Sequence, residues 1–271
     1  MQYAALSNGV KLPMIGYGTF LIKDGALCGQ CVTNALEAGY RLFDTAQMYG
    51  NEAALGEALQ VNHIPREDVF LISKVNNSDQ WYEPTLASLH ASLEKLQTDY
   101  LDAFLIHWPG QNRERTDSTW RALEHASRDG LVKSIGVCNF ELPQLEALLQ
   151  HCEIPPMLNQ IEHTPLLHDP ELLSFCNSHG IQVMAWAPLL RGKFGEVIPE
   201  IAKKYHKTPA QLLLRWNIQQ GILPIPKSKN PERLAENFNV FDFSIAEEDM
   251  LTLNGMNEGK RTSHDPLTFD F

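Results

Sequence analysis

No stretch of this 271-residue sequence approaches the roughly 20 consecutive apolar residues that a membrane-spanning helix requires. The first residues also lack the basic-then-apolar arrangement of a secretory signal. Basic residues are in the minority, since 22 Lys and Arg stand against 33 Asp and Glu and give a formal net charge of −11. These features disfavour a membrane protein, a secreted protein and a nucleic-acid binder.

Cysteine is scarce, and the common metal-binding motifs are missing. The five cysteines, an odd number, predict reduced thiols and a cytoplasmic location. Cys28 and Cys31 have C-x-x-C spacing, but they fall in a helical segment without a partner pair, so we do not expect a redox or zinc role. The ten histidines form no H-E-x-x-H motif and no 2-His-1-carboxylate spacing, so the sequence predicts no metal site.

Three short apolar runs each end on a different ionisable residue. Residues 41–43 lead into Asp44, residues 69–73 into Lys74, and residues 103–106 into His107. Runs this short and this rich in Ile, Val, Leu and Phe are typical of buried parallel strands. The three ionisable side chains should therefore share one edge of a sheet, and Tyr49 follows Asp44 in the adjoining loop.

A helix, a glycine and an apolar strand recur in that order along the chain. The glycines, which suit the left-handed residue that ends a helix, are Gly39, Gly130, Gly180 and Gly221. Such junctions predict parallel strands with helical crossovers. The eight strands expected are 14–18, 42–44, 69–74, 103–107, 134–137, 158–161, 182–186 and 222–225. The clearest helices expected are 86–96, 142–149 and 210–218.

Eight strand–helix units without a linker or low-complexity tract predict an α/β fold, a single (β/α)8 TIM barrel domain over residues 1–271. Asn8-Gly9 between two short apolar runs predicts a two-residue hairpin turn, with the hairpin plugging the lower end of the barrel. Residues 246–253 should form an extra helix, followed by an irregular tail. An open doubly wound sheet is the alternative, but its G-x-G-x-x-G fingerprint is missing.

The four residues at the predicted sheet edge suit acid catalysis at a carbonyl. A buried Lys74 beside Asp44 stays charged, and its ammonium should lower the pKa of the Tyr49 hydroxyl. Tyr49 would then protonate a carbonyl oxygen, and a neutral His107 would orient the substrate. None of these side chains can supply a hydride, so a nicotinamide cofactor is required.

Several segments carry a resemblance to a known family. They are Phe43-Asp44-Thr45-Ala46-Gln47-Met48-Tyr49-Gly50-Asn51-Glu52, Leu105-Ile106-His107-Trp108-Pro109, Ile135-Gly136-Val137-Cys138-Asn139-Phe140, Asn159-Gln160-Ile161-Glu162 and Ile225-Pro226-Lys227-Ser228. In order and spacing the chain resembles the aldo-keto reductase superfamily, and most of all the small bacterial 2,5-diketo-D-gluconate reductase-like members. The resemblance implies a (β/α)8 barrel, NADPH as cofactor, and Asp44, Tyr49, Lys74 and His107 as the catalytic tetrad.

The resemblance also implies where the ligands bind. Trp186 should stack on the nicotinamide, Asn139 and Gln160 should bind its carboxamide, and Cys138 stands where most relatives have Ser. The full cofactor set implied is Gly18, Thr19, Asp44, Asn139, Gln160, Trp186, Pro188, Leu189, Gly192, Lys193, Lys227, Ser228, Arg233, Glu236 and Asn237. The pocket mouth implied for the substrate consists of Phe20, Gln47, Met48, Tyr49, His107, Trp108 and Asn139.

Two other functions remain as alternatives. Some proteins of this type are channel subunits that bind NADPH and catalyse poorly, but those carry extra segments that we do not expect here. A Schiff-base enzyme with Lys74 as nucleophile is disfavoured, because an ion-paired lysine is protonated and a poor nucleophile. We expect a cytoplasmic monomer that reduces a small polar carbonyl compound, because the connection after Pro109 and the tail after Asn254 are both short.

Overall fold

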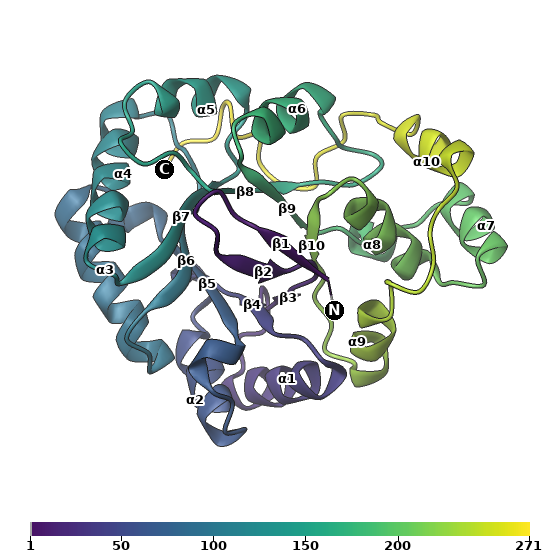
Figure 1. Cartoon of the computed structure of the whole chain (residues 1–271), viewed down its shortest axis with the longest axis horizontal. Helices are drawn as coiled ribbons and strands as arrows, with labels where there is room; N and C mark the ends of the chain where they lie inside the picture. The colour runs from purple at the N-terminus through teal and green to yellow at the C-terminus, as the bar shows by residue number, and fades with distance from the viewer. Residues whose placement is uncertain (1) are drawn as a thin grey trace.

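The computed structural model describes residues 2–271 and places eight parallel strands around a central axis, with helices outside them (Figure 1). Neighbours in the sheet follow chain order from β3 to β10. The strands are β3 (Tyr17–Gly18), β4 (Leu42–Asp44), β5 (Phe70–Val75), β6 (Leu101–Ile106), β7 (Val132–Cys138), β8 (Leu158–Glu162), β9 (Gln182–Trp186) and β10 (Leu223–Ile225). This arrangement confirms the predicted (β/α)8 barrel.

Backbone hydrogen bonds between the first and last strands close the barrel. The amide of Gly16 donates to the carbonyl of Pro224 at 3.1 Å, and the amide of Gly18 donates to that of Pro226 at 3.1 Å. Pro224 and Pro226 have no amide hydrogen and cannot donate a hydrogen bond to the first strand. The junction between the first and last strands is therefore held by the amides on the β3 side. The predicted first strand, 14–18, is correspondingly reduced to two residues.

Ten α-helices are described in residues 2–271, two more than the eight units require. The helices are α1 (Gly25–Ala38), α2 (Glu52–Val61), α3 (Tyr82–Leu96), α4 (Arg113–Arg128), α5 (Leu142–Leu149), α6 (Pro170–Ser178), α7 (Val197–Lys204), α8 (Pro209–Gln219), α9 (Pro231–Phe238) and α10 (Glu247–Asn254). The extra helix expected near the C-terminus is α10. Helix α7 was not predicted, and its apolar residues pack with α8 rather than with the barrel.

The N-terminal hairpin lies across one end of the barrel (Figure 1). Its strands, β1 (Tyr3–Ala5) and β2 (Lys11–Pro13), are antiparallel, and Leu12 is fully buried among barrel-interior residues. The predicted two-residue turn is wrong. The Leu6 amide bonds to the Val10 carbonyl, so the loop has three residues and ends on Gly9 with φ +83°. A left-handed third residue is the usual solution for such loops.

The barrel interior changes from apolar to polar along the strands. Leu42, Ile72, Leu158 and Met184 belong to one apolar cluster inside the barrel. Because side chains two positions apart in a strand share a face, the next inward-facing residues are Asp44, Lys74, Gln160 and Trp186. The packed core therefore supports a polar layer at the carboxyl ends of the strands, where barrel enzymes carry their active sites.

Candidate active site

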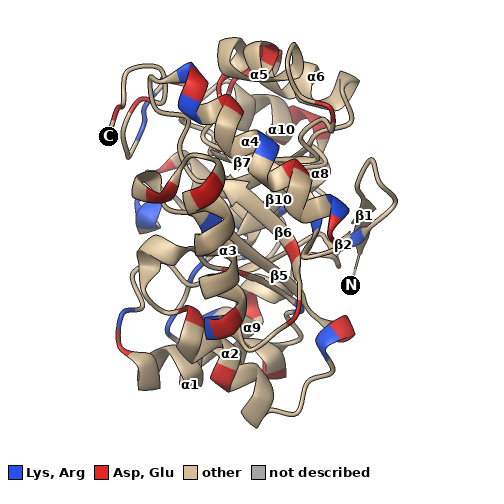
Figure 2. Ribbon diagram, turned by 90° about the vertical axis from the view of Figure 1, so that its left-hand side faces the viewer, with Lys and Arg blue, Asp and Glu red and all other residues tan. Residues whose placement is uncertain are grey.

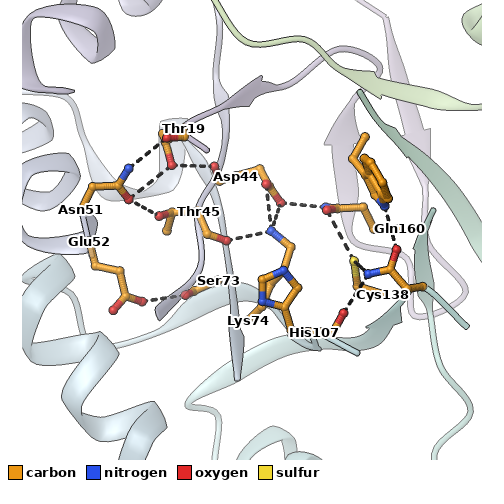
Figure 3. Close-up of polar contacts among 12 residues, drawn as sticks. Thr19, Asp44, Thr45, Asn51, Glu52, Ser73, Lys74, His107, Cys138 and Gln160 are labelled. Atoms are coloured by element: carbon orange, nitrogen blue, oxygen red, sulfur yellow. Dashed lines mark hydrogen bonds and ion pairs between the residues drawn. The ribbon is translucent and has the colours of Figure 1, made fainter. Parts of the chain in front are cut away.

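The Asp44–Lys74 ion pair lies at the centre of this polar layer (Figure 3). Lys74 Nζ is 2.8 Å from both Asp44 carboxylate oxygens and donates to the Thr45 carbonyl at 2.8 Å. Lys74 is fully buried and Asp44 nearly so. The three acceptor oxygens compensate the ammonium for lost water, and a protonated amine so held is a poor nucleophile, which argues against a Schiff-base role.

Tyr49 and His107 complete the predicted tetrad. Tyr49 ends the short 3-10 helix η1 (Gln47–Tyr49), and Lys74 Nζ lies 5.2 Å from the centroid of its ring. The rings of Tyr49 and His107 are 5.7 Å apart and meet edge to face. The structure thus brings together the four residues that the ends of the apolar runs predicted.

The pKa of Lys74 is raised, and this keeps the amine charged. Burial by itself lowers the pKa of Lys74, but Asp44 and the Tyr49 hydroxyl more than offset the burial. For Tyr49 the balance differs from our expectation. Burial raises the pKa of Tyr49 above its ordinary value, and the Lys74 ammonium offsets only part of that rise. Tyr49 is therefore a protonated phenol at neutral pH, and Lys74 favours the tyrosinate that remains once the proton has left.

His107 is neutral at physiological pH. Burial lowers the pKa of His107 well below its ordinary value, and the charge of Lys74 lowers it further. Its buried Nδ1 has no hydrogen-bond partner among residues 2–271. A neutral imidazole donates from one ring nitrogen and accepts at the other, so the ring can orient a small ligand beside Tyr49 through its second nitrogen.

Amide side chains connect the ion pair with the end of β9 (Figure 3). Gln160 Nε2 donates to Asp44 at 2.7 Å, and its Oε1 lies 3.7 Å from Cys138 Sγ. Asn139 Nδ2 lies 3.2 Å from the same sulfur, and Asn139 Oδ1 accepts from Trp186 Nε1 at 2.8 Å. Asn139 Nδ2 also donates to the His107 carbonyl at 3.0 Å, so one hydrogen-bonded chain connects the ion pair and His107 with the half-buried indole of Trp186.

Several of the non-glycine residues with left-handed backbone lie directly after β7 and β9. Asn139 after β7 has φ 64°, Ala187 after β9 has φ 49°, and Arg191 has φ 52°. Such conformations are unfavourable for residues with a Cβ, and they gather at functional sites where the surrounding structure enforces them. They direct the segments after β7 and β9 around the predicted ligand.

Three cations after β10 fit the extra phosphate of NADP(H). Lys227, Lys229 and Arg233 form no ion pair with any residue in 2–271. Partial burial lowers the pKa of Lys227, and neighbouring Lys229 lowers it further. Clustered cations that no carboxylate pairs with are suited to a phosphate dianion.

The other predicted cofactor residues have varied surroundings. Gly18 ends β3, and Thr19 donates to the Asp44 carbonyl at 3.0 Å. Glu236 is engaged elsewhere, because its carboxylate accepts from Thr208 at the start of α8 at 2.8 Å. Asn237 is buried. Pro188, Leu189, Gly192 and Lys193 lie on the loop after β9, and Ser228 lies on the loop after β10.

Aromatic and apolar side chains surround the Tyr49 hydroxyl. Phe20 is 46 % exposed with its ring 5.0 Å from that of Tyr49, and Met48 is 49 % exposed. Trp108 is buried beneath Phe269 of the C-terminal tail, with 4.9 Å between the ring centroids. The C-terminal tail thus helps to form the mouth of the predicted substrate pocket. The short length of the tail did not predict this contribution.

Gln47 differs from the substrate role predicted for it. Its Nε2 donates to the Ser88 carbonyl at 2.8 Å and to Ser92 Oγ at 2.9 Å, both on α3. Its Oε1 accepts from the Asn76 amide at 2.7 Å. Gln47 therefore anchors the helix that carries Tyr49, and its amide is already saturated by the protein.

The remaining features carry no evident chemistry. Cys28 and Cys31 are buried free thiols in α1, and burial raises the pKa of Cys28 to about 11. Within residues 2–271, no group of three or more His, Cys, Asp or Glu side chains is arranged to hold a metal ion. No helix in this part of the chain has the length and apolarity needed to cross a membrane.

Comparison with known proteins agrees with this geometry. The model of the Aldo/keto reductase family matches residues 15–258. Glyoxal reductase from Bacillus subtilis is 44 % identical over 96 % of this chain and 95 % of its own length. The 9,11-endoperoxide prostaglandin H2 reductase from Trypanosoma cruzi is 45 % identical over 97 % of this chain and 94 % of its own. The crystal structure of a Gox0644 variant in complex with NADPH has a TM-score of 0.94 and 36 % identity, covering 100 % of this chain and 99 % of that one.

Proposed function

Because the chain belongs to the aldo/keto reductase family, we propose that it reduces small, reactive aldehydes and ketones to alcohols. Membership makes it an NADP(H)-dependent oxidoreductase. The roles of individual residues and the substrate class are what we propose. The observation that carries them is the buried Asp44–Lys74 pair beside the Tyr49 ring, which the neutral His107 ring meets edge to face.

Tyr49 is the proton donor of the proposed reaction. Its hydroxyl gives a proton to the carbonyl oxygen, and the negative charge that develops on the phenolate is stabilised by the Lys74 ammonium. Asp44 keeps Lys74 charged and fixed. Neutral His107 hydrogen-bonds the carbonyl oxygen and orients it toward Tyr49.

When bound, NADPH would supply the hydride that adds to the carbonyl carbon. Trp186, Asn139 and Gln160 would hold the nicotinamide end, since they offer an aromatic face and amide groups toward the carboxyl ends of three neighbouring strands. Lys227 and Arg233 would hold the phosphate end.

The proposed substrates are compact polar carbonyls, such as methylglyoxal, a β-keto ester or 2,5-diketo-D-gluconate. The mouth is formed by Phe20, Met48, Tyr49 and Trp108, and two of these are about half exposed. A mouth this open buries little apolar area, so a large lipid gains little from binding there. The Bacillus relative acts on glyoxal, whereas the Trypanosoma relative acts on a prostaglandin, so both sizes belong in the test.

The test is NADPH oxidation by the wild type and by Tyr49→Phe across methylglyoxal, a diketogluconate, a β-keto ester and a ketosteroid. We expect the wild type to prefer the small dicarbonyls. We expect Tyr49→Phe to lose roughly 100-fold or more in kcat, because a positioned general acid contributes about that much, with NADPH affinity unchanged. A preference for the ketosteroid would contradict the substrate class, and full activity of Tyr49→Phe would contradict the role of the acid.

We also propose that the enzyme acts as a cytoplasmic monomer. Every residue of the proposed site comes from one chain, and all five cysteines are free thiols in the structure. Reduced thiols are typical of the cytosol. Light scattering at micromolar concentration would measure the oligomeric state.

A further inference from the structure

Asn51 is buried beside the catalytic groups. Its amide does not titrate, so it takes no direct part in proton transfer. It occupies the N-cap position of α2, where an asparagine usually accepts a hydrogen bond from the first turn of the helix. Here its side chain makes no capping bond. Figure 3 shows the amide turned toward Thr19 and Thr45 instead.

The Asn51 amide is saturated by partners that lie outside its own helix. Its Nδ2 donates to the carbonyls of Thr19 and Ile22, each at 3.0 Å. Its Oδ1 accepts from Thr45 Oγ1 at 2.7 Å and from Thr19 Oγ1 at 3.4 Å. Both N–H donors of the amide and its oxygen are therefore engaged, with the Thr45 hydroxyl as the firm donor to that oxygen, so Asn51 ties the end of β3 to the end of β4.

Two of the three partners of Asn51, Thr45 and Thr19, also bond to the ion pair. The carbonyl of Thr45 is the third acceptor of the Lys74 ammonium, at 2.8 Å. The amide and the hydroxyl of Thr19 both donate to the Asp44 carbonyl at 3.0 Å. One residue therefore fixes the backbone on the acidic side and on the basic side of the pair.

We propose that Asn51 is a positioning residue that, through Thr45, fixes the Lys74 ammonium beside Tyr49. The proposal rests on the proposed function of Tyr49 as acid. Tyr49 is faced by Asp44 from β4, Lys74 from β5, His107 after β6 and Cys138 from β7, and of these Lys74 is the cation that favours tyrosinate. Moving Lys74 away weakens Tyr49 as an acid without removing any reacting group.

Asn51→Ala tests this directly. We expect kcat to fall by roughly 10- to 100-fold, as displacement of a catalytic group by about an ångström produces. We expect the alkaline limb of the pH–rate profile to move upward, because a more distant Lys74 lowers the pKa of the tyrosine less. Affinity for NADPH, followed by tryptophan fluorescence, should fall less than kcat, since Asn51 contacts Thr19 of the predicted cofactor set but forms no hydrogen bond with Lys227 or Arg233 of the predicted clamp. If Asn51 had only a structural role, its loss would lower the fraction of active enzyme and leave the pH–rate profile unchanged.

Two further variants complete the test. Asn62→Ala removes a side chain at the other end of α2, where it donates to Thr33 and to the Ala58 carbonyl, so it controls for weakening the helix alone. We expect it to keep the wild-type pH profile. Thr45→Val keeps the carbonyl that binds Lys74 but deletes the hydroxyl that donates to Asn51, and we expect a smaller shift in the same direction.

The outcomes separate this inference from the function on which it rests. A wild-type pH profile in Asn51→Ala and Thr45→Val, or in Thr45→Val alone if the first variant does not fold, would overturn the positioning role. An equal shift in Asn62→Ala would overturn it too. A wild-type protein that oxidises no NADPH with any carbonyl overturns the proposed function first, and this role with it.

Discussion

Arg233 should contribute more than any other residue to the preference for NADPH over NADH. It lies in the first turn of α9, and Asn230 caps that turn by accepting from the Arg233 amide at 2.8 Å. The guanidinium itself has no carboxylate partner among residues 2–271. A planar fork of donors beside Lys227 is matched to phosphate oxygens, which NADH lacks at this position.

We therefore expect Arg233→Ala to weaken NADPH binding by about one to two decades, because a charge-assisted hydrogen bond contributes roughly 1.5–3 kcal/mol. NADH binding should be nearly unchanged. Fluorescence titration of both cofactors measures this, with Arg121→Ala on α4 as a control for loss of a surface cation. Equal weakening for both cofactors would place Arg233 outside the phosphate site.

At the scale of elements, two helical glycines have opposite surroundings. A Cβ on Gly56 of α2 would lie 2.6 Å from the Leu96 carbonyl oxygen at the end of α3, so the two helices approach because this residue has no side chain. A Cβ on Gly29 of α1 would meet nothing within 4 Å. Sequence alone does not separate the two, since each is a glycine inside a helical segment.

Gly56→Ala should lower the free energy of unfolding by about 1–3 kcal/mol, the usual effect of overpacking against atoms that cannot move. Gly29→Ala should raise it by up to about 1 kcal/mol, because alanine favours the helix. Urea denaturation of the two variants measures both. If Gly56→Ala were as stable as Gly29→Ala, the close approach of α2 and α3 would be contradicted.

Elements with strong local patterns were predictable, and elements defined by their neighbours were not. The apolar runs before Asp44, Lys74 and His107 predicted the strands and the tetrad. Side chains alternate between the two faces of a strand, so the pattern of apolar interior residues also shows which residue at the strand end faces the interior. The contact of Phe269 with Trp108 depends on long-range packing that leaves no local period, whereas α7 has a helical period in Ile198, Ile201 and Ala202 but is only eight residues long. The Asn51 network could not be predicted either, since two of its partners lie 32 and 29 residues away in the chain and nothing in the sequence shows that the nearer Thr45 bonds to it.

Over the whole molecule, charge is distributed rather than concentrated. Figure 2 shows acidic and basic residues spread over the outer helices and loops on the side shown, without a single basic face. The formal net charge of −11 repels anions in general, so an anionic dinucleotide must be attracted locally, by the cations after β10. The barrel places these cations and the catalytic pair on the same end, because both follow the carboxyl ends of parallel strands.

One buried histidine should make the stability of the whole molecule depend on pH. His163, directly after β8, is fully buried and stacked on Trp216 of α8 with 4.7 Å between the rings. Its Nδ1 lies 2.8 Å from Asn217 Oδ1, whereas its Nε2 has no partner among residues 2–271. Burial lowers the pKa of His163 to about 4, although its bond to Asn217 opposes the shift.

The unfolded chain, in which this histidine titrates near 6.5, therefore binds the proton more readily than the folded chain does. Stability from this group is complete above pH 6.5 and is lost as the pH falls toward 4, by about 3 kcal/mol in all. His163→Gln should flatten that part of a plot of unfolding free energy against pH, whereas His90→Gln, at an exposed position on α3, should leave it unchanged. His107 and His168, whose pKa values are also lowered by burial, should contribute to the slope that remains. An identical slope in wild type and His163→Gln would show that His163 is not the group that titrates.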